Sequence, residues 1–288
     1  MNKNNKNNPN NRNSKNIKEI KRVNQNEKNV IYFNDELNDE FSKAKIIPRK
    51  IDGRFKYNKS AFWEFWSFLI QNVLSMPIKI LYLKIKFNHK YIGTEKFKKY
   101  RKEGFFIYSN HTQAFSDTFT PSVAVYPKRN FLIVNPANIS LKGTGWLVEL
   151  LGAIPIPEGI EAYKNFLNRI KNRIDKGYSI SIYPEAHIWP YYTKIRPFKD
   201  VSFKYPVQLN TPVFCITNTY QEEQNLKNKL KKKITMVSYI DGPFFPDNSL
   251  NKKEAQEKLR DEVYKKMCER SKNNNVEKII YKKVIRRI

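Results

Sequence analysis

The chain has 288 residues, of which 40% are hydrophobic, so it can bury the core of one large domain with extensions. Its formal net charge of +27 favours an anionic partner, which could be a phospholipid surface, a nucleic acid or an acidic carrier protein. The cysteines, Cys215 and Cys268, form no CxxC pair. This excludes a disulfide framework and a zinc-binding spacing, and it fits a reducing cytoplasm.

The N-terminal region is rich in Asn and Lys and has no hydrophobic period over residues 1–45. Such a composition cannot bury enough apolar surface to fold, so we expect a disordered tail. The region is basic but lacks the apolar core of a secretory signal peptide.

The next stretch, "SAFWEFWSFLIQNVLSMPIKILYLKIKF" over residues 60–87, is strongly apolar. Its longest uncharged run has 14 residues and ends at Lys79, whereas a spanning helix needs about 20. Apolar residues cover more than one helical stripe, so the helix must be buried in protein or in lipid. Trp63 and Trp66 suit a headgroup boundary. We predict a helical membrane-associating segment over residues 46–90 that binds the bilayer without crossing it. The alternative is a helix packed on the core.

Strand and helix patterns alternate through residues 91–288. Strands are expected at 104–110, 130–137, 152–157, 178–185, 211–220 and 234–244, and helices at 117–125, 144–152, 160–177, 202–210 and 252–271. Alternation of this kind predicts one α/β domain with a central sheet.

The stretch "FFIYSNHTQAFSD", residues 105–117, places His111 just after an apolar strand. Functional groups gather beyond the carboxyl ends of strands in α/β folds. A histidine there can accept a proton from a hydroxyl, and a carboxylate bonded to its other nitrogen would fix its tautomer. His111 and Asp117 would not share a helical face. They can pair only if His111 lies in the loop and Asp117 in the first helical turn. The alternative is a polar loop with a capping Asp.

A second strand ends in polar groups at Glu185 and His187. Lys194, Arg196 and Lys199 follow within the same stretch. Basic side chains beside a strand end are typical of a phosphate clamp, whereas the alternative is a solvated basic loop.

Together these stretches resemble the glycerolipid acyltransferase family, which includes bacterial 1-acylglycerol-3-phosphate acyltransferase. "IYSNHTQAFSD" is similar to the family's His-x4-Asp motif, and "GTGWLVELLGAIPIP" to its second region. "YPEAHI", "RPFKDVSFK" and "TPVFCI" are similar to its later motifs, and the likeness covers residues 60–270. The resemblance implies a three-layer glycerol-3-phosphate acyltransferase-like fold with a mixed central sheet, preceded by a membrane-associating helical segment.

The chain departs from the family pattern at several positions. Five residues separate the His from the Asp, so Ser116 stands at the usual Asp position. Residues 186–188 replace the usual Gly-Thr-Arg, and the missing arginine leaves Lys194 or Arg196 to take its place. Pro157-Glu158 stand where the second region usually ends in Arg.

The resemblance also implies a mechanism without an acyl-enzyme. His111, oriented by Asp117, would deprotonate a glycerol hydroxyl, which would attack the thioester of acyl-CoA or acyl-carrier protein. Glu185 would shape the acceptor site, and Arg196 and Lys199 would hold its phosphate. Lys194 and His187 are further substrate-binding candidates, and His187 is also the competing base. Neither a metal nor another cofactor is implied.

We therefore expect an acyltransferase that makes phosphatidic acid from a lysophospholipid at an anionic membrane surface. Its expected location is the cytoplasmic face of the cell membrane, as a peripheral or monotopic protein. The alternatives are another acceptor, such as a glycolipid or an amine, or a non-enzymatic lipid-binding relative. A nucleic-acid partner is not expected, because the aromatic residues lie in apolar runs rather than among basic residues.

Overall fold

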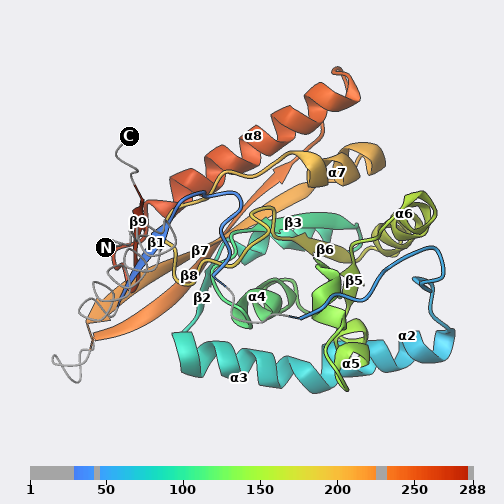
Figure 1. The fold of residues 1–288 in the computed structure, drawn as a ribbon, viewed down its shortest axis with the longest axis horizontal. Helices are drawn as coiled ribbons and strands as arrows, with labels where there is room; N and C mark the ends of the chain where they lie inside the picture. Colours follow the sequence, from blue (N-terminus) through green and yellow to red (C-terminus); the bar gives the residue numbers. More distant parts are fainter. Residues whose placement is uncertain (1–28, 42–45, 225–231, 285–288) are drawn as a thin grey trace, which may run out of the picture.

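The computed structural model describes residues 29–41, 46–224 and 232–284 (Figure 1). The described strands are β1 (Val30–Phe33), β2 (Lys90–Ile92), β3 (Phe105–Ser109), β4 (Asn130–Val134), β5 (Ala153–Pro155), β6 (Ser179–Ile182), β7 (Val213–Gln224), β8 (Lys232–Phe244) and β9 (Ile280–Lys283). The described helices are α2 (Ala61–Phe68), η1 (Leu69–Leu74), α3 (Ser75–Phe87), η2 (Thr94–Tyr100), α4 (Ser116–Ala124), η3 (Pro136–Ile139), α5 (Gly145–Leu150), α6 (Ile160–Asp175), η4 (Val201–Phe203), α7 (Lys204–Leu209) and α8 (Lys252–Ser271).

The central sheet has seven strands in the order β2-β8-β7-β3-β6-β4-β5. The strands β7, β3, β6, β4 and β5 run parallel to one another, whereas β8 runs antiparallel to β7 and parallel to β2. The sheet is therefore mixed, and the predicted α/β fold class is confirmed.

Alternate residues of β3 fill the two cores of the domain. Phe106 and Tyr108 pack in the cluster that includes Phe166 of α6 and Leu259 of α8. Phe105 belongs to the opposite cluster, with residues of η2 and α4. Both faces of β3 are fully buried, as expected for a parallel strand covered on both sides. Figure 1 shows α6, α7 and α8 on one face of the sheet and α3 and α4 on the other.

The two long amphipathic helices follow their sequence patterns. In α8 the buried residues recur every fourth position, at Ala255, Leu259, Val263 and Met267, and the Asn251 side chain caps the first turn. Beyond α6, Gly177 has a φ of +73°, and a Cβ there would lie 2.4 Å from a backbone oxygen. Only glycine fits this turn.

The expected disordered tail needs a correction. Residues 1–28 and 42–45 lie outside the described residues, but residues 29–41 are described. Within them β1 pairs in parallel with β9, and Phe33 is buried. The tail prediction was wrong for residues 29–41 because a distant C-terminal strand supplies the pairing that the local composition does not suggest.

The apolar stretch forms one continuous helix, Ala61–Phe87, made of α2, the π-helical η1 and α3. By length and composition alone this helix is able to cross a bilayer. Over α2 and η1 its buried residues are polar, namely Ser67, Gln71 and Asn72, whereas α3 buries Lys79 together with the apolar Met76, Leu83 and Phe87. Its exposed face is apolar and includes Phe62, Phe65, Val73, Leu74, Ile78, Leu81 and Ile85. Over α2 and η1 the helix is thus inverted relative to a surface helix of a water-soluble protein, and along its whole length it exposes large apolar side chains.

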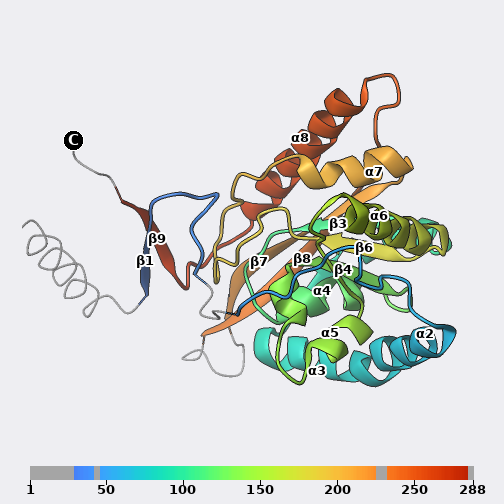
Figure 2. The same cartoon turned by 45° about the vertical axis from the view of Figure 1, so that its right-hand side comes forward.

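Side-chain hydrogen bonds fasten this polar face to the sheet and its loops. Ser67 Oγ donates to the Leu150 carbonyl at 2.7 Å, and Asn72 Nδ2 donates to the Pro127 carbonyl at 3.0 Å. Burial lowers the pKa of Lys79 to about 8. The helix therefore lies flat along one edge of the domain (Figures 1 and 2).

Candidate active site

His111 lies two residues beyond the last residue of β3. The intervening Asn110 is buried and pairs with Asn218 of the neighbouring β7. Its Nδ2 donates to the Asn218 carbonyl at 3.0 Å, and its Oδ1 accepts from the Asn218 N–H at 2.8 Å. This pair fixes the point at which the chain leaves the sheet, and it places His111 at the carboxyl end of the strand, as the sequence predicts.

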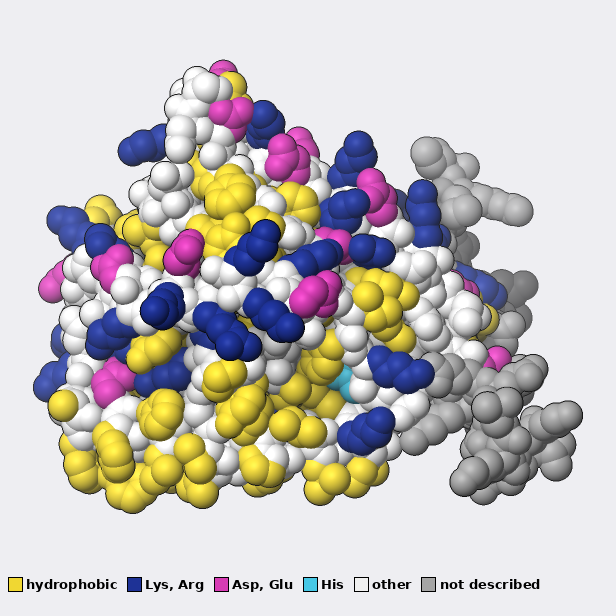
Figure 3. All heavy atoms as spheres, turned by 180° about the vertical axis from the view of Figure 1, so that it is seen from behind, with side chains coloured by type: hydrophobic (Ala, Val, Ile, Leu, Met, Phe, Trp, Pro, Cys, Tyr) yellow, Lys and Arg dark blue, Asp and Glu magenta, His cyan; other side chains and the backbone are white. Residues whose placement is uncertain are grey.

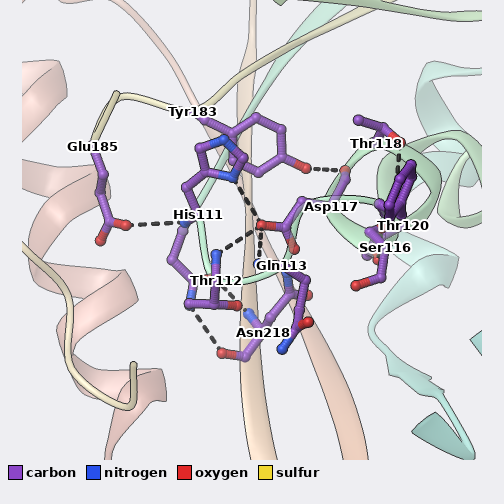
Figure 4. A network of polar contacts seen from close by, with 12 residues as sticks. His111, Thr112, Gln113, Ser116, Asp117, Thr118, Thr120, Tyr183, Glu185 and Asn218 are labelled. Carbon is purple, nitrogen blue, oxygen red and sulfur yellow. Dashed lines mark hydrogen bonds and ion pairs between the residues drawn. The ribbon is translucent and has the colours of Figure 1, made fainter. Parts of the chain in front are cut away.

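His111 and Asp117 are in contact. The distance between His111 Nδ1 and Asp117 Oδ2 is 2.9 Å (Figure 4). The same oxygen accepts the backbone N–H groups of Thr112 at 2.7 Å and Gln113 at 2.8 Å. Asp117 lies in the first turn of α4, and His111 lies in the preceding loop. The expected pairing geometry is confirmed, and the extra residue is accommodated between the two side chains.

The Asp117 carboxyl is fully buried. Burial raises its pKa, and the hydrogen bond from His111 opposes that rise. A buried carboxylate that receives three N–H donors is held in one place and cannot turn toward solvent. Asp117 therefore orients the imidazole and can stabilise positive charge on it.

The other ring nitrogen, His111 Nε2, makes no hydrogen bond with any described residue. The His111 side chain is 16% exposed, so this nitrogen can be reached by a small group. Figure 4 shows the ring with one nitrogen toward Asp117 and the other pointing away from it. This arrangement allows Nε2 to accept a proton from a hydroxyl.

Tyr183 is a site residue that the sequence analysis missed. Its ring stacks on the His111 ring, with centroids 4.5 Å apart and planes at 27°. Its hydroxyl donates to the Asp117 backbone carbonyl. The available signal was its place at the start of the stretch "YPEAHI", directly before Pro184-Glu185. Tyr183 therefore packs on the imidazole and holds the start of α4.

Glu185 holds the loop that carries His111. Its Oε2 accepts the His111 backbone N–H at 2.9 Å, and its Oε1 accepts the Arg196 backbone N–H at 2.9 Å. Burial raises the pKa of Glu185, and the Arg196 charge opposes this rise. Both carboxylate oxygens are engaged by the protein itself, so Glu185 acts on the site through the His111 loop, and its role in shaping the acceptor site stays a prediction.

The chain is similar to one known protein family over part of its length. A family model described as Acyltransferase matches residues 88–218, a range that includes His111, Asp117 and Glu185. Residues 88–218 are therefore similar to this family. The predicted resemblance to this family is confirmed.

The chain is also similar to a solved structure. The crystal structure of the 1-acyl-sn-glycerophosphate acyltransferase PlsC from Thermotoga maritima is similar, with 18% identity and a TM-score of 0.49. The match covers 75% of this chain and 89% of that chain. A comparison with curated proteins found no match.

Arg196 is not available as a headgroup ligand. Its side chain is fully buried, and its guanidinium contacts Glu185, the His187 carbonyl and the Glu36 carbonyl. It also lies over the Trp189 ring at 4.9 Å. The prediction of a phosphate contact was wrong, because sequence does not reveal that this guanidinium points inward and is neutralised there.

The remaining predicted substrate-binding residues are not buried. Lys194 and Lys199 are exposed, and Lys194 lines a surface hollow with Lys272. His187 is 33% exposed, and its Nδ1 lies 3.7 Å from Glu40 Oε2. Their roles stay predictions. Among the three histidines, only His111 has a buried carboxylate at hydrogen-bond distance from its ring.

No group of three or more His, Cys, Asp or Glu side chains that could hold a metal ion occurs within residues 29–41, 46–224 and 232–284. The arrangement at His111 is that of a general base with an orienting carboxylate.

Proposed function

We propose that this protein is a membrane-associated acyltransferase that moves a fatty acyl group to a hydroxyl of a lysophospholipid. The donor is acyl-CoA or acyl-carrier protein, and the first candidate acceptor is 1-acyl-glycerol-3-phosphate, which would give phosphatidic acid. The observation that carries the proposal is the bond of 2.9 Å between His111 Nδ1 and Asp117 Oδ2, with Nε2 left open, within the range that is similar to the acyltransferase family.

In the proposed reaction, His111 Nε2 takes the proton of the acceptor hydroxyl while its oxygen attacks the thioester carbonyl. The resulting tetrahedral adduct expels the thiolate, which takes the proton back from the imidazolium. The Asp117 carboxylate stabilises the imidazolium between these two steps. General-base assistance of this kind contributes about 10²–10⁴-fold to a rate. A thioester is already activated, so the proposed reaction needs no metal or redox cofactor.

The exposed apolar face of the helix Ala61–Phe87 supports a place at the membrane surface. Its apolar residues face outward while Ser67, Gln71 and Asn72 are held against the domain. Such a helix lies in the interfacial plane with its apolar side in the acyl layer. The cytoplasmic face of an anionic membrane is the location consistent with the net charge of +27 and with soluble acyl donors.

A second candidate is an acceptor without a phosphate, such as a glycolipid or an amine. The burial of Arg196 favours it, because the residue expected to replace the missing motif arginine is occupied by Glu185 and backbone carbonyls. Phosphate recognition would then depend on exposed side chains such as Lys194 and Lys199.

The test is acyl transfer on liposomes with labelled acyl-CoA or acyl-carrier protein. The acceptor panel would contain 1-acyl-glycerol-3-phosphate, a lysophospholipid with a choline headgroup, a monoacyl glycolipid and a long-chain amine. Transfer to the first acceptor is the expected result, and preference for the glycolipid or the amine would establish the second candidate. His111→Ala should abolish transfer, whereas His187→Ala should retain it. No transfer to any acceptor would refute the proposed function.

A further inference from the structure

The two ends of the described chain meet beside the catalytic loop. β1 and β9 form a parallel two-stranded sheet, closed by bonds from the Ile280 N–H to the Asn29 carbonyl at 2.8 Å and from the Val284 N–H to the Phe33 carbonyl at 2.7 Å. Figures 1 and 2 show these strands side by side at one end of the molecule. We call residues 29–41 and 276–284 the terminal clasp. Neither part lies within the range matched by the family.

The terminal clasp encloses Trp189, which is fully buried. The Trp189 ring stacks on Tyr281 at 5.1 Å and 11°, and it contacts Phe33 at 4.8 Å and Phe41 at 5.1 Å. Trp189 Nε1 donates to the Asp39 carbonyl at 2.9 Å. The indole is thus fixed by side chains and backbone from both ends of the chain.

The clasp also holds the part of the loop that follows Trp189. The Tyr281 hydroxyl donates to the Pro190 carbonyl at 2.9 Å. From the N-terminal part, the Glu36 carbonyl accepts from Arg196 Nη1 at 3.2 Å. These bonds tie the loop over residues 185–196 to the clasp at two separate points.

The loop enclosed by the clasp in turn holds His111. The Trp189 N–H donates to the His111 carbonyl at 3.1 Å, and the Tyr191 N–H donates to the Thr112 carbonyl at 3.1 Å. Glu185, at the start of the same loop, accepts the His111 N–H. Both backbone polar groups of His111 are therefore satisfied by one loop. A shift of that loop would carry His111 with it.

We infer that Trp189 is a positioning residue for His111 and that the terminal clasp sets its place. The inference rests on the proposed function only in taking His111 as the base. A displacement of about 1 Å at a reacting group can cost about 10²-fold in rate, so a loop that fixes His111 on both sides of its Cα matters for turnover. Substrate binding does not depend on this contact directly.

The closing experiment compares two Tyr→Phe variants of the full chain. Tyr281→Phe removes the bond to the Pro190 carbonyl but keeps the stacking on Trp189. Tyr57→Phe is the matched control, because its hydroxyl also donates to a proline carbonyl, that of Pro155, at 2.8 Å. We expect kcat to fall about fivefold in Tyr281→Phe, because a change of that size corresponds to the free energy of about one hydrogen bond. The KM should stay within about twofold of the parent value. Tyr57→Phe should leave kcat unchanged.

A second readout is independent of turnover. The chain has three histidines, so imidazole NMR signals can be assigned by single substitutions. Tyr281→Phe and Trp189→Phe should shift the His111 ring signals, whereas Tyr57→Phe should not. Unchanged His111 signals and unchanged kcat in Tyr281→Phe would overturn the inference, as would equal effects of the two Tyr→Phe variants. Shifted signals in a protein without transfer activity would uphold the positioning contact and reject the proposed function instead. If Trp189→Phe does not fold, Tyr281→Phe alone decides.

Discussion

At the scale of single residues, one oxygen atom explains how the longer His-to-Asp spacing is tolerated. Asp117 Oδ2 accepts from the His111 ring and from the N–H groups of Thr112 and Gln113. The two backbone bonds wrap the loop around the carboxylate, so an added residue changes the loop and leaves the contact intact. Ser116, at the position that usually carries the Asp, is buried, and its Oγ has no hydrogen-bond partner among the described residues.

Asp117→Asn tests this arrangement. The amide oxygen can still accept the two backbone N–H groups, so the loop should keep its shape and the free energy of unfolding should change little. The negative charge that stabilises the imidazolium is lost, so kcat should fall by about 10²-fold or more. Steady-state kinetics with labelled donor measure the effect. Ser116→Ala is the control and should keep normal activity. Normal activity of Asp117→Asn together with loss of activity in Ser116→Ala would show that Ser116, rather than Asp117, is the residue on which His111 depends.

His89 predicts how stability depends on pH. Burial lowers its pKa to about 3 from the ordinary 6.5, and its Nε2 shares a hydrogen bond of 2.7 Å with Ser238 Oγ. Between these values the unfolded chain binds a proton that the folded chain does not. The contribution of His89 to the free energy of unfolding is therefore fully present above pH 6.5, and it is lost as the pH falls toward 3.

Urea unfolding at several pH values measures this linkage. The His89 contribution has a slope of up to about 1.4 kcal/mol per pH unit. His89→Gln should remove this slope from the free energy of unfolding between pH 6.5 and 4, a window that follows from the two pKa values. His187→Gln, at a ring that is 33% exposed, should keep the slope. Equal slopes in the His89 variant and the parent protein would contradict the assignment.

At the scale of elements, α2 is fixed by a buried charge cluster. Glu64 of α2 accepts from Arg169 Nη1 at 2.8 Å and from Arg173 of α6, and Arg129 Nη1 lies 3.6 Å from it. Burial acts to raise the pKa of Glu64, but the charges of Arg169 and Arg173 outweigh it and hold that pKa below its ordinary value. One carboxylate therefore balances three largely buried guanidiniums.

Glu64→Gln should remove the only carboxylate of this cluster and leave three arginines in mutual repulsion. Loss of one partner of a buried ion pair costs about 3–5 kcal/mol, and we expect the free energy of unfolding to fall by about 3 kcal/mol. Glu257→Gln is the matched control, because its pair with Lys253 is a surface i,i+4 pair worth about 0.5 kcal/mol or less. Chemical denaturation compares the two. A loss below 1 kcal/mol for Glu64→Gln would show that the cluster does not fasten α2.

The elements predicted from sequence are those with a strong local pattern. β3, α6, α8 and the helix Ala61–Phe87 were expected, because apolar period and flanking caps mark them. β1, β2 and β9 were not expected, because each is at most four residues long, and β1, although apolar, lies in an otherwise Asn- and Lys-rich region. Such strands exist only through partners that are distant in the sequence.

In the candidate site, too, some features could be predicted from the sequence and others could not. The position of His111 at a strand end and its contact with Asp117 could be predicted, since both follow from the strand pattern and the motif. The inward direction of Arg196 and the stacking of Tyr183 could not, because they depend on how the loop over residues 185–196 folds back on His111. Arg196 was predicted to bind a phosphate from its charge alone.

At the scale of the whole molecule, the apolar side chains gather along one edge. Figure 3 shows them along the bottom of the view, the edge at which α2 and α3 lie in Figure 1, with Lys and Arg side chains above them. A bilayer would bury the apolar edge and bring anionic headgroups to the basic band. A spanning orientation would instead expose to lipid the polar residues that now bond to the domain, such as Ser67 and Asn72, at a cost of several kcal/mol for each unsatisfied group.

The double variant Ile78→Ser with Ile85→Ser tests this orientation on anionic liposomes. Both side chains are about two-thirds exposed, at 66% and 67%, and each replacement removes about 2 kcal/mol of apolar transfer free energy, so binding should weaken by more than tenfold in a sedimentation assay. Ile160→Ser on α6 is the control. Ile160 is 80% exposed but lies outside the helix Ala61–Phe87, so the binding of this variant to liposomes should be unchanged. Lipids brominated near the headgroup should quench the fluorescence of Trp66 in the parent protein and not in the double variant. Equal binding of the parent protein and both variants would show that the apolar edge does not enter the bilayer. In a separate experiment, protease cleavage at the two ends of Ala61–Phe87 from opposite sides of a membrane would show that the helix crosses it.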